Sequence, residues 1–172
     1  MNEVEYERTF LARYLPEEIN SVIPSEIVDT MFPADAHHPQ LRLRKNGNKY
    51  FMTKKAPVND TDKSVQYEDT IILTINEYNA LAVAPGKSLE KDRYKVEING
   101  FLAEVDVFKG DLKGLVVIDF EFRTEEEKNT FVQPDVCLAD VTQEDFIAGG
   151  LLCGKAYADI EAELARFNYK KL

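Results

Sequence analysis

The sequence feature that most constrains this fold is an alternation of apolar and polar side chains with a period of two residues. Successive side chains of an extended strand point to opposite faces, so each alternating segment is predicted to be a half-buried β-strand. The protein is therefore expected to be α+β and mainly β. The alternating segments are 3–10, 41–44, 50–55, 65–73, 89–98, 101–108 and 115–122.

Turn residues separate two pairs of these segments. Asn46-Gly47-Asn48 lies within residues 41–55, and Asn99-Gly100 divides residues 89–108. Asn and Gly adopt the positive φ angles of tight hairpin turns at low energetic cost. Both pairs are therefore predicted to be antiparallel β-hairpins.

Short helices are expected between the strands. Thr74 and Thr124 are each followed three residues later by Glu, which is the capping-box pattern of a helix N-terminus. A last helix is predicted over residues 155–167 from its apolar spacing. Gly149-Gly150 is expected to break a helix, and residues 56–63 are expected to form a surface loop.

Composition limits the class of protein. With 172 residues, 44% of them hydrophobic, the chain is long enough for one domain, residues 1–172, with its own core. Its 31 acidic and 21 basic residues give a net charge of −10, which argues against a surface for nucleic acid or membranes. No apolar run approaches the ~20 residues of a membrane helix, and the N-terminus lacks the apolar core of a signal peptide. We therefore expect a cytoplasmic protein that binds neither nucleic acid nor membranes.

Charges of one sign share a face on several strands, because residues i and i+2 of a strand point the same way. Like charges side by side repel, so a solvated face usually mixes the two signs. The acidic pairs are Glu5 and Glu7, Glu104 and Asp106, and Asp119 and Glu121. The basic pairs are Arg42 and Arg44, and Lys91 and Arg93.

Two arrangements accommodate these faces. One is a sheet with its charged side in water and its other side against helices. The other is a sheet curled into a barrel, in which the charged faces converge on a polar lumen. There the carboxylates would suit hard divalent cations, and the guanidinium and ammonium groups would suit phosphate oxygens. The grouping by sign favours the barrel, and a metal-bound polyphosphate is the ligand expected.

Ordered motifs along most of the chain resemble the CYTH superfamily, the triphosphate tunnel metalloenzymes. Residues 5–11, EYERTFL, resemble the N-terminal E-x-E-x-K signature of that family. The further matches are Leu41-Arg42-Leu43-Arg44 to the R-x-R strand, Tyr50–Lys55 to Y-F-x-T-x-K, Tyr67-Glu68 to the acidic strand after it, Lys91-Asp92-Arg93-Tyr94 to K-x-R-Y, Glu104–Phe108 to E-x-D-x-F, and Asp119–Phe122 to the closing E-x-E strand.

The resemblance implies a closed, eight-stranded antiparallel barrel that forms a tunnel, with helices packed outside. It also implies Mg²⁺ or Mn²⁺ as cofactor and hydrolysis of a triphosphate, such as inorganic or thiamine triphosphate. The implied metal ligands are Glu5, Glu7, Glu104, Asp106, Asp119 and Glu121. The implied phosphate-binding residues are Arg42, Arg44, Lys55, Lys91, Arg93 and Lys155. The residues implied to act directly in catalysis are Lys91, Arg93 and Glu68.

The chain departs from the family pattern at several positions. Thr9 replaces the lysine of the first signature, Gln66 replaces an acid of many members, and Ser64 falls where some have arginine. Arg13 or Lys155 could compensate for the lost cation at position 9. These departures bear on the substrate and on turnover.

Three functions remain open from the sequence. Hydrolysis of a small-molecule triphosphate is the first. Cyclisation of ATP, as in class IV adenylate cyclases, is the second, and binding of polyphosphate or nucleotide without turnover is the third. The chain is expected to be a monomer or a homodimer. Cys137 and Cys153 have no metal-ligand spacing, so zinc and thiol chemistry are not expected.

Overall fold

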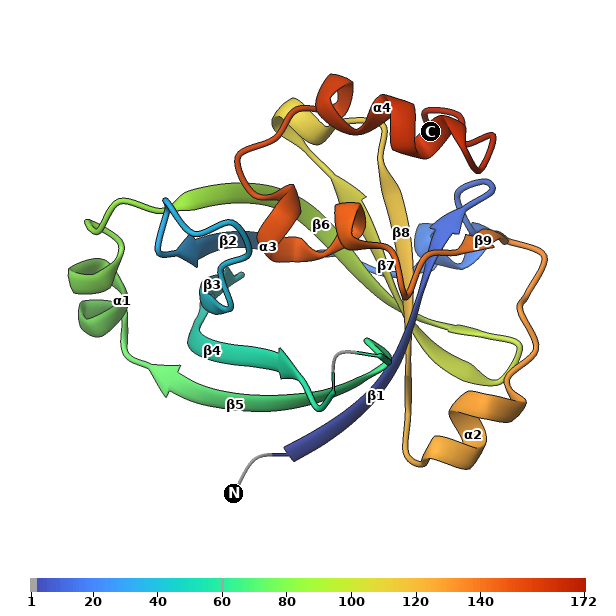
Figure 1. The fold of residues 1–172 in the computed structure, drawn as a ribbon, viewed down its shortest axis with the longest axis horizontal. Coiled ribbons are helices and arrows are strands. Elements are labelled where there is room, and N and C mark those ends of the chain that lie inside the picture. Colours follow the sequence, from blue (N-terminus) through green and yellow to red (C-terminus); the bar gives the residue numbers. More distant parts are fainter. Residues whose placement is uncertain (1–2, 60) are drawn as a thin grey trace.

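The computed structural model describes residues 3–59 and 61–172, and these contain nine strands and several short helices (Figure 1). The strands are β1 (Glu3–Ala12), β2 (Ser25–Phe32), β3 (Leu41–Asn46), β4 (Lys49–Pro57), β5 (Val65–Leu73), β6 (Lys87–Ile98), β7 (Phe101–Phe108), β8 (Val116–Phe122) and β9 (Cys137–Asp140). The α-helices are α1 (Ile75–Leu81), α2 (Glu125–Thr130), α3 (Gly149–Leu152) and α4 (Tyr157–Ala165), and the 3₁₀ helices are η1 (Glu17–Ser21), η2 (Gly110–Leu112) and η3 (Asp145–Ile147).

Eight of the described strands form a closed antiparallel barrel, as predicted. Their order is β5-β4-β3-β2-β6-β7-β8-β1, and β1 pairs back onto β5 to close the ring. The closing seam is short, because β1 and β5 share only four paired positions, from Glu3–Glu68 to Tyr6–Val65. Beyond the seam, β1 continues along β8 and its last residues pair with β9.

The two predicted hairpins are present, β3–β4 and β6–β7. Asn99 and Gly100 have φ angles of 53° and 83°, so both residues of this tight turn use the left-handed region. In the other hairpin Gly47 alone has a positive φ, and Asn46 pairs with Lys49 as the last residue of β3. This turn therefore consists of Gly47 and Asn48, and of the two only the glycine uses the left-handed region.

The sequence signals located the starts of α1 and α2 correctly, but they overestimated the length of the last helix. The Thr74 capping box at α1 is complete, whereas Thr124 accepts from the N–H of Glu127 while the Glu127 carboxylate accepts from Arg123. The last helix, α4, covers Tyr157–Ala165 and is therefore shorter than the predicted helix over residues 155–167. The expectation for Gly149-Gly150 is wrong, since these residues begin α3 instead of breaking a helix.

Two strands were not predicted, and each has a sequence reason. In β2 the buried residues are Ile27, Asp29 and Met31, so a carboxylate interrupts the apolar row. The strand β9 has four residues, too few for a periodicity to be read. Residues 58–64 connect β4 to β5, close to the expected loop at 56–63, of which residue 60 lies outside the described residues.

The apolar cores lie largely outside the barrel, between its wall and the helices. One cluster joins Phe10 and Phe120 to Phe131, whose ring centroid is 4.7 Å from that of Phe120. The other includes Ile160 and Leu164 of α4, both almost fully buried. Figure 1 shows α2 and α4 outside the barrel, near opposite ends of β8. Because the outward faces carry these apolar contacts, the alternate residues of the same strands are left to face the lumen.

No helix in the described part of the chain is long and apolar enough to cross a membrane.

Candidate active site

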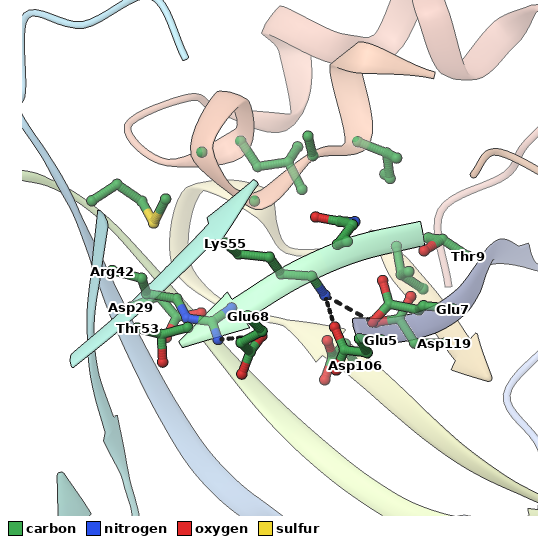
Figure 2. A pocket seen from close by; sticks show the side chains of 18 of the residues that line it. Glu5, Glu7, Thr9, Asp29, Arg42, Thr53, Lys55, Glu68, Asp106 and Asp119 are labelled. Carbon is green, nitrogen blue, oxygen red and sulfur yellow. Dashed lines mark hydrogen bonds and ion pairs between the residues drawn. The ribbon is translucent and has the colours of Figure 1, made fainter. Parts of the chain in front are cut away.

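A cavity of about 630 Å³ occupies the barrel, and alternate residues from all eight barrel strands line it (Figure 2). The charged strand residues on its wall are Glu5, Glu7, Asp29, Arg42, Arg44, Lys55, Glu68, Lys91, Arg93, Lys95, Glu104, Asp106, Asp119 and Glu121. The acidic and basic faces identified in the sequence therefore meet across one lumen. Of the predicted site residues, Lys155 alone is missing from this wall.

The two residues considered as replacements for a lysine at position 9 lie elsewhere. The strand β1 ends at Ala12, and Arg13 donates to the main-chain oxygens of Asp135 and Cys137. Lys155 lies between α3 and α4. Neither side chain lines the cavity, so at position 9 the wall carries the hydroxyl of Thr9 without a compensating cation from these two residues.

Three carboxylates converge at one side of the lumen. Glu7 lies opposite Glu121 in the β1–β8 register, and Glu5 lies two residues before Glu7 on the same face. One oxygen from each of the three can be chosen so that all lie within 4.8 Å of one another. Lys55 of β4 reaches the same group, with its Nζ 2.5 Å from Glu5 Oε2 and 3.2 Å from Glu7 Oε2 (Figure 2).

This donor set fits a divalent cation of the magnesium type. Carboxylate oxygens are the ligands that Mg²⁺ and Mn²⁺ prefer, and their negative charges repel one another unless a cation lies between them. Glu121 is solvent-accessible, whereas Glu5 and Glu7 are half-buried, so the group is open on one side for water or substrate oxygens. The ammonium group of Lys55 contacts two of the three carboxylates that would bind a metal.

Asp106 and Glu104 lie in a separate network of buried ion pairs. The guanidinium of Arg93 donates to both oxygens of Asp106, at 2.7 and 2.6 Å, and also contacts Glu104. Lys91 Nζ donates to Asp106 as well. The β6–β7 register produces this network, because Arg93 pairs directly with Asp106. Both carboxylates were expected as metal ligands, and in this structure both contact cations of β6.

A second buried pair orients the basic side of the wall. Arg44 donates to both oxygens of Asp29, each at 2.7 Å, and this carboxylate was missed in the sequence because it lies in the unpredicted strand β2. Burial opposes ionisation of Asp29, but the neighbouring Arg44 outweighs it and lowers the pKa to about 2. The pair is therefore charged throughout the neutral range, and Arg44 is held by Asp29.

Arg42 is a wall cation whose guanidinium makes no hydrogen bond to another described residue. Its Nε is buried and has no hydrogen-bond partner in residues 3–59 and 61–172. Its nearest acidic partner is Glu68, at 3.9 Å, which is beyond hydrogen-bond distance. A buried donor without a partner is costly, so this guanidinium is poised for an anionic oxygen in the lumen.

One end of the lumen is closed by apolar side chains. Leu89, Phe108 and Val117 continue the inward-facing rows of β6, β7 and β8, and they pack with Ile147 and Leu152 of η3 and α3. Each is at most 8% exposed. The sequence contained a signal for this closed end, because each of Lys91, Asp106 and Asp119 has an apolar residue two positions away. The residues that pack on these apolar side chains come from a distant segment, so the closure itself was not predicted. The charged part of the lumen is thus bordered at one end by a buried apolar layer.

The CYTH domain family matches residues 21–144. The chain belongs to the CYTH domain family. The matched range begins after β1, so the family match does not include Glu5 and Glu7. Their position on the cavity wall comes from the structure alone.

Related proteins agree with the CYTH assignment. The chain is 32% identical over 142 residues to an inorganic triphosphatase of Nitrosomonas europaea, which covers 81% of this chain and 90% of that protein. The crystal structure of the inorganic triphosphatase NE1496 superposes with a TM-score of 0.63 at 26% identity, over 88% of this chain and 95% of that one. A putative adenylate cyclase of Bacillus halodurans, at 15% identity and a TM-score of 0.56 over 99% of this chain and 93% of that one, shares the fold.

Several carboxyl groups of the CYTH barrel have raised pKa values. Burial, followed by the charges of Glu7 and Asp106, raises the pKa of Asp119 to about 8. Burial and the neighbouring acids raise the pKa of Glu121 to about 6, and burial also raises that of Glu5. Asp119 is therefore expected to hold a proton at neutral pH when no metal is bound.

These shifts predict opposite pH trends for stability and metal binding. The pKa of Asp119 in the folded state, about 8, exceeds the ~3.9 of an unfolded aspartate, so the folded metal-free protein binds more protons. Its free energy of unfolding is expected to fall as pH rises between these two values. Affinity for Mn²⁺ should rise through the same range, most steeply between about 6 and about 8, because the metal competes with these protons.

Urea unfolding and calorimetric Mn²⁺ titration across this range measure the two trends. Asp119→Asn is the matched variant, and its free energy of unfolding should vary less with pH. A wild-type Mn²⁺ affinity that does not change with pH would contradict the prediction.

Proposed function

We propose that this protein is a divalent-metal-dependent triphosphatase that hydrolyses inorganic triphosphate or an organic triphosphate such as thiamine triphosphate. The observation that carries the proposal is the convergence of a three-carboxylate group and several cations on one cavity. The 32% identity to an inorganic triphosphatase over most of both chains supports it. A lumen with both signs of charge suits a metal-bound polyphosphate, which presents both a cation and anionic oxygens.

The carboxylates would hold the metal. Glu5, Glu7 and Glu121 form the proposed primary ligand set, with Asp119 beside them on β8, and Mg²⁺ or Mn²⁺ is the proposed ion. When bound, such an ion neutralises phosphate oxygens and lowers the barrier to in-line displacement. Glu104 and Asp106 would not contact the metal directly. They would hold Arg93 and Lys91 in place by ion pairs.

The cations would bind the phosphates and stabilise the charge that develops during hydrolysis. Arg42 offers its unpartnered Nε, with Glu68 beside it as a positioning residue, and Arg44 is fixed by Asp29. Water attacks the terminal phosphorus and gives up a proton to solvent, and the bond from that phosphorus to the bridging oxygen breaks. Orthophosphate forms, and pyrophosphate, or the diphosphate of an organic substrate, leaves with the bonding electron pair. With Thr at position 9, stabilisation of that leaving group depends on Lys91 and Arg93.

A substrate panel tests the proposal. Tripolyphosphate, thiamine triphosphate and ATP are incubated with Mg²⁺ or Mn²⁺, and orthophosphate and cAMP are both measured. We expect orthophosphate from at least one substrate, complete loss of release with a chelator, and no cAMP. Arg42→Ala protein, prepared in parallel, excludes a contaminating phosphatase.

Two results would contradict the proposal. Release of cAMP from ATP without orthophosphate would show a cyclase. Calorimetric binding of tripolyphosphate without any turnover in Mn²⁺ would show a binding module.

A further inference from the structure

A polar cluster outside the lumen is not accounted for by the proposed chemistry. It consists of Asp62, Ser64, Lys128 and Gln143, and we refer to it as the seam clamp. Lys128 is 4% exposed and Ser64 is 5% exposed, whereas Asp62 is half-buried and Gln143 is exposed, so the cluster runs from the interior to the surface. A buried lysine is costly unless it is paired and hydrogen-bonded, which indicates that this cluster has a specific role.

Asp62 is the centre of the seam clamp. Its Oδ1 accepts from Ser64 N at 2.9 Å, from Ser64 Oγ at 2.5 Å and from Gln143 Nε2 at 3.0 Å. Its Oδ2 accepts from Lys128 Nζ at 3.1 Å, and Lys128 Nζ also donates to Ser64 Oγ at 2.7 Å. Three distant segments are thereby tied together: the β4–β5 connection, α2, and the segment after β9.

The seam clamp lies where the barrel is least supported by strand pairing. The β1–β5 pairing ends at Tyr6–Val65, and the next main-chain bond runs from Glu7 N to Ser64 O, at 2.9 Å. Ser64 is therefore a member of the clamp, and its main-chain oxygen also accepts a hydrogen bond from Glu7, a proposed metal ligand. Lys128 Nζ also lies 5.9 Å from the ring centroid of Tyr6, the residue before Glu7.

We propose that Asp62, Ser64, Lys128 and Gln143 are positioning residues that hold the β1–β5 seam closed and so keep Glu5 and Glu7 in the geometry that binds the metal. This inference rests on the proposed function for its metal, but the closure of the seam is independent of it. The bonds between β1 and β5 are few, so the clamp adds restraint on the Ser64 side of Glu7, beside the bonds of Thr9 to Val141 and Thr142. Partners that orient ligand-bearing groups commonly affect metal affinity as well as stability.

The test uses Lys128→Met, which removes the ammonium and keeps much of the side-chain volume, and Asp62→Asn, which keeps the shape and removes the charge. Leu164→Ala is the control, because Leu164 lies on α4 in an apolar cluster that contains no residue of the seam clamp, and its truncation lowers overall stability. Two quantities are measured on the intact proteins under conditions where all are folded. They are hydrogen exchange of the Glu7 amide and the dissociation constant for Mn²⁺ without substrate.

Both clamp variants are expected to exchange the Glu7 amide faster than wild type, while amides of the β6–β7 hairpin keep their wild-type rates. Their Mn²⁺ dissociation constants should rise about tenfold, at the lower end of the range for outer-shell substitutions. Leu164→Ala should leave the Mn²⁺ dissociation constant unchanged. The double variant should weaken Mn²⁺ binding by less than the product of the two single effects, because the residues act through each other.

Three outcomes would overturn the proposal. They are an unchanged Glu7 exchange rate in both clamp variants, unchanged Mn²⁺ affinity despite faster exchange, and an equal loss of Mn²⁺ affinity in Leu164→Ala. A wild-type protein that binds no Mn²⁺ would instead refute the proposed function, and Glu7 exchange would still report separately on the clamp.

Discussion

Glu7→Gln is expected to reduce metal-dependent phosphate release from a triphosphate at least about 100-fold, more than typical outer-shell substitutions at metal sites. Glu7 provides an oxygen to the three-carboxylate group, and the amide of Gln removes the negative charge without changing the size of the side chain. The Mn²⁺ dissociation constant should rise in parallel. Steady-state phosphate release and calorimetric Mn²⁺ titration measure the two effects.

The matched control is Glu161→Gln, the same chemical change at an exposed position of α4. It should leave both quantities at wild-type values. Circular dichroism and thermal unfolding verify that Glu7→Gln is folded. Wild-type activity in Glu7→Gln would refute the metal-binding role of this residue.

Arg93→Met is expected to destabilise the protein by about 3–5 kcal/mol, the range for removing one partner from a buried ion pair. The guanidinium of Arg93 contacts Asp106, Glu104 and Asp119, and all three are largely or fully buried in the barrel. Among the described residues, Asp106 would retain Lys91 as its one ion-pair partner. Burial by itself favours the protonated acid, but Arg93 and Lys91 outweigh it and hold the pKa of Asp106 well below its usual range. Arg93→Met should therefore raise that pKa, and its loss of stability should grow as pH rises toward neutrality.

Arg166→Met is the comparison for this effect. Arg166 also contacts two acids, Glu144 and Glu163, but its side chain is 52% exposed against 12% for Arg93. Exposed pairs of this kind contribute little to stability, so this variant should unfold with almost the wild-type free energy. Urea denaturation at pH values of about 5 and about 8 measures both variants. Equal losses in the two would show that burial does not decide the contribution of the Arg93 network.

Local patterns were sufficient for much of the architecture. The alternation in β6, β7 and β8 and the Asn99-Gly100 turn are signals within a few residues of each other, and strand and hairpin formation depend on just such short-range preferences. The same periodicity assigned Glu7, Arg42 and Arg93 to charged faces. Closure into a barrel was inferred from two features: charged side chains of one sign share a strand face, and the motifs resemble the CYTH family.

The register between distant strands was not available from the sequence. It places Arg93 opposite Asp106 and so makes that carboxylate part of an ion-pair network, while Glu7 comes opposite Glu121. Asp29 was missed for a related reason. Its role depends on Arg44, which pairs with it across β2–β3, and β2 has no clear alternation.

Side-chain periodicity is a property of each strand, so the chain alone specified which residues share a face and which sign of charge each face presents. Which faces become neighbours depends on strand order, on register and on the short β1–β5 seam. Those are set by the summed packing of Phe10, Phe120 and the helices outside the barrel, to which residues far apart in sequence contribute. The tertiary structure therefore decided which carboxylates are grouped, which are neutralised by arginine, and which end of the lumen is closed.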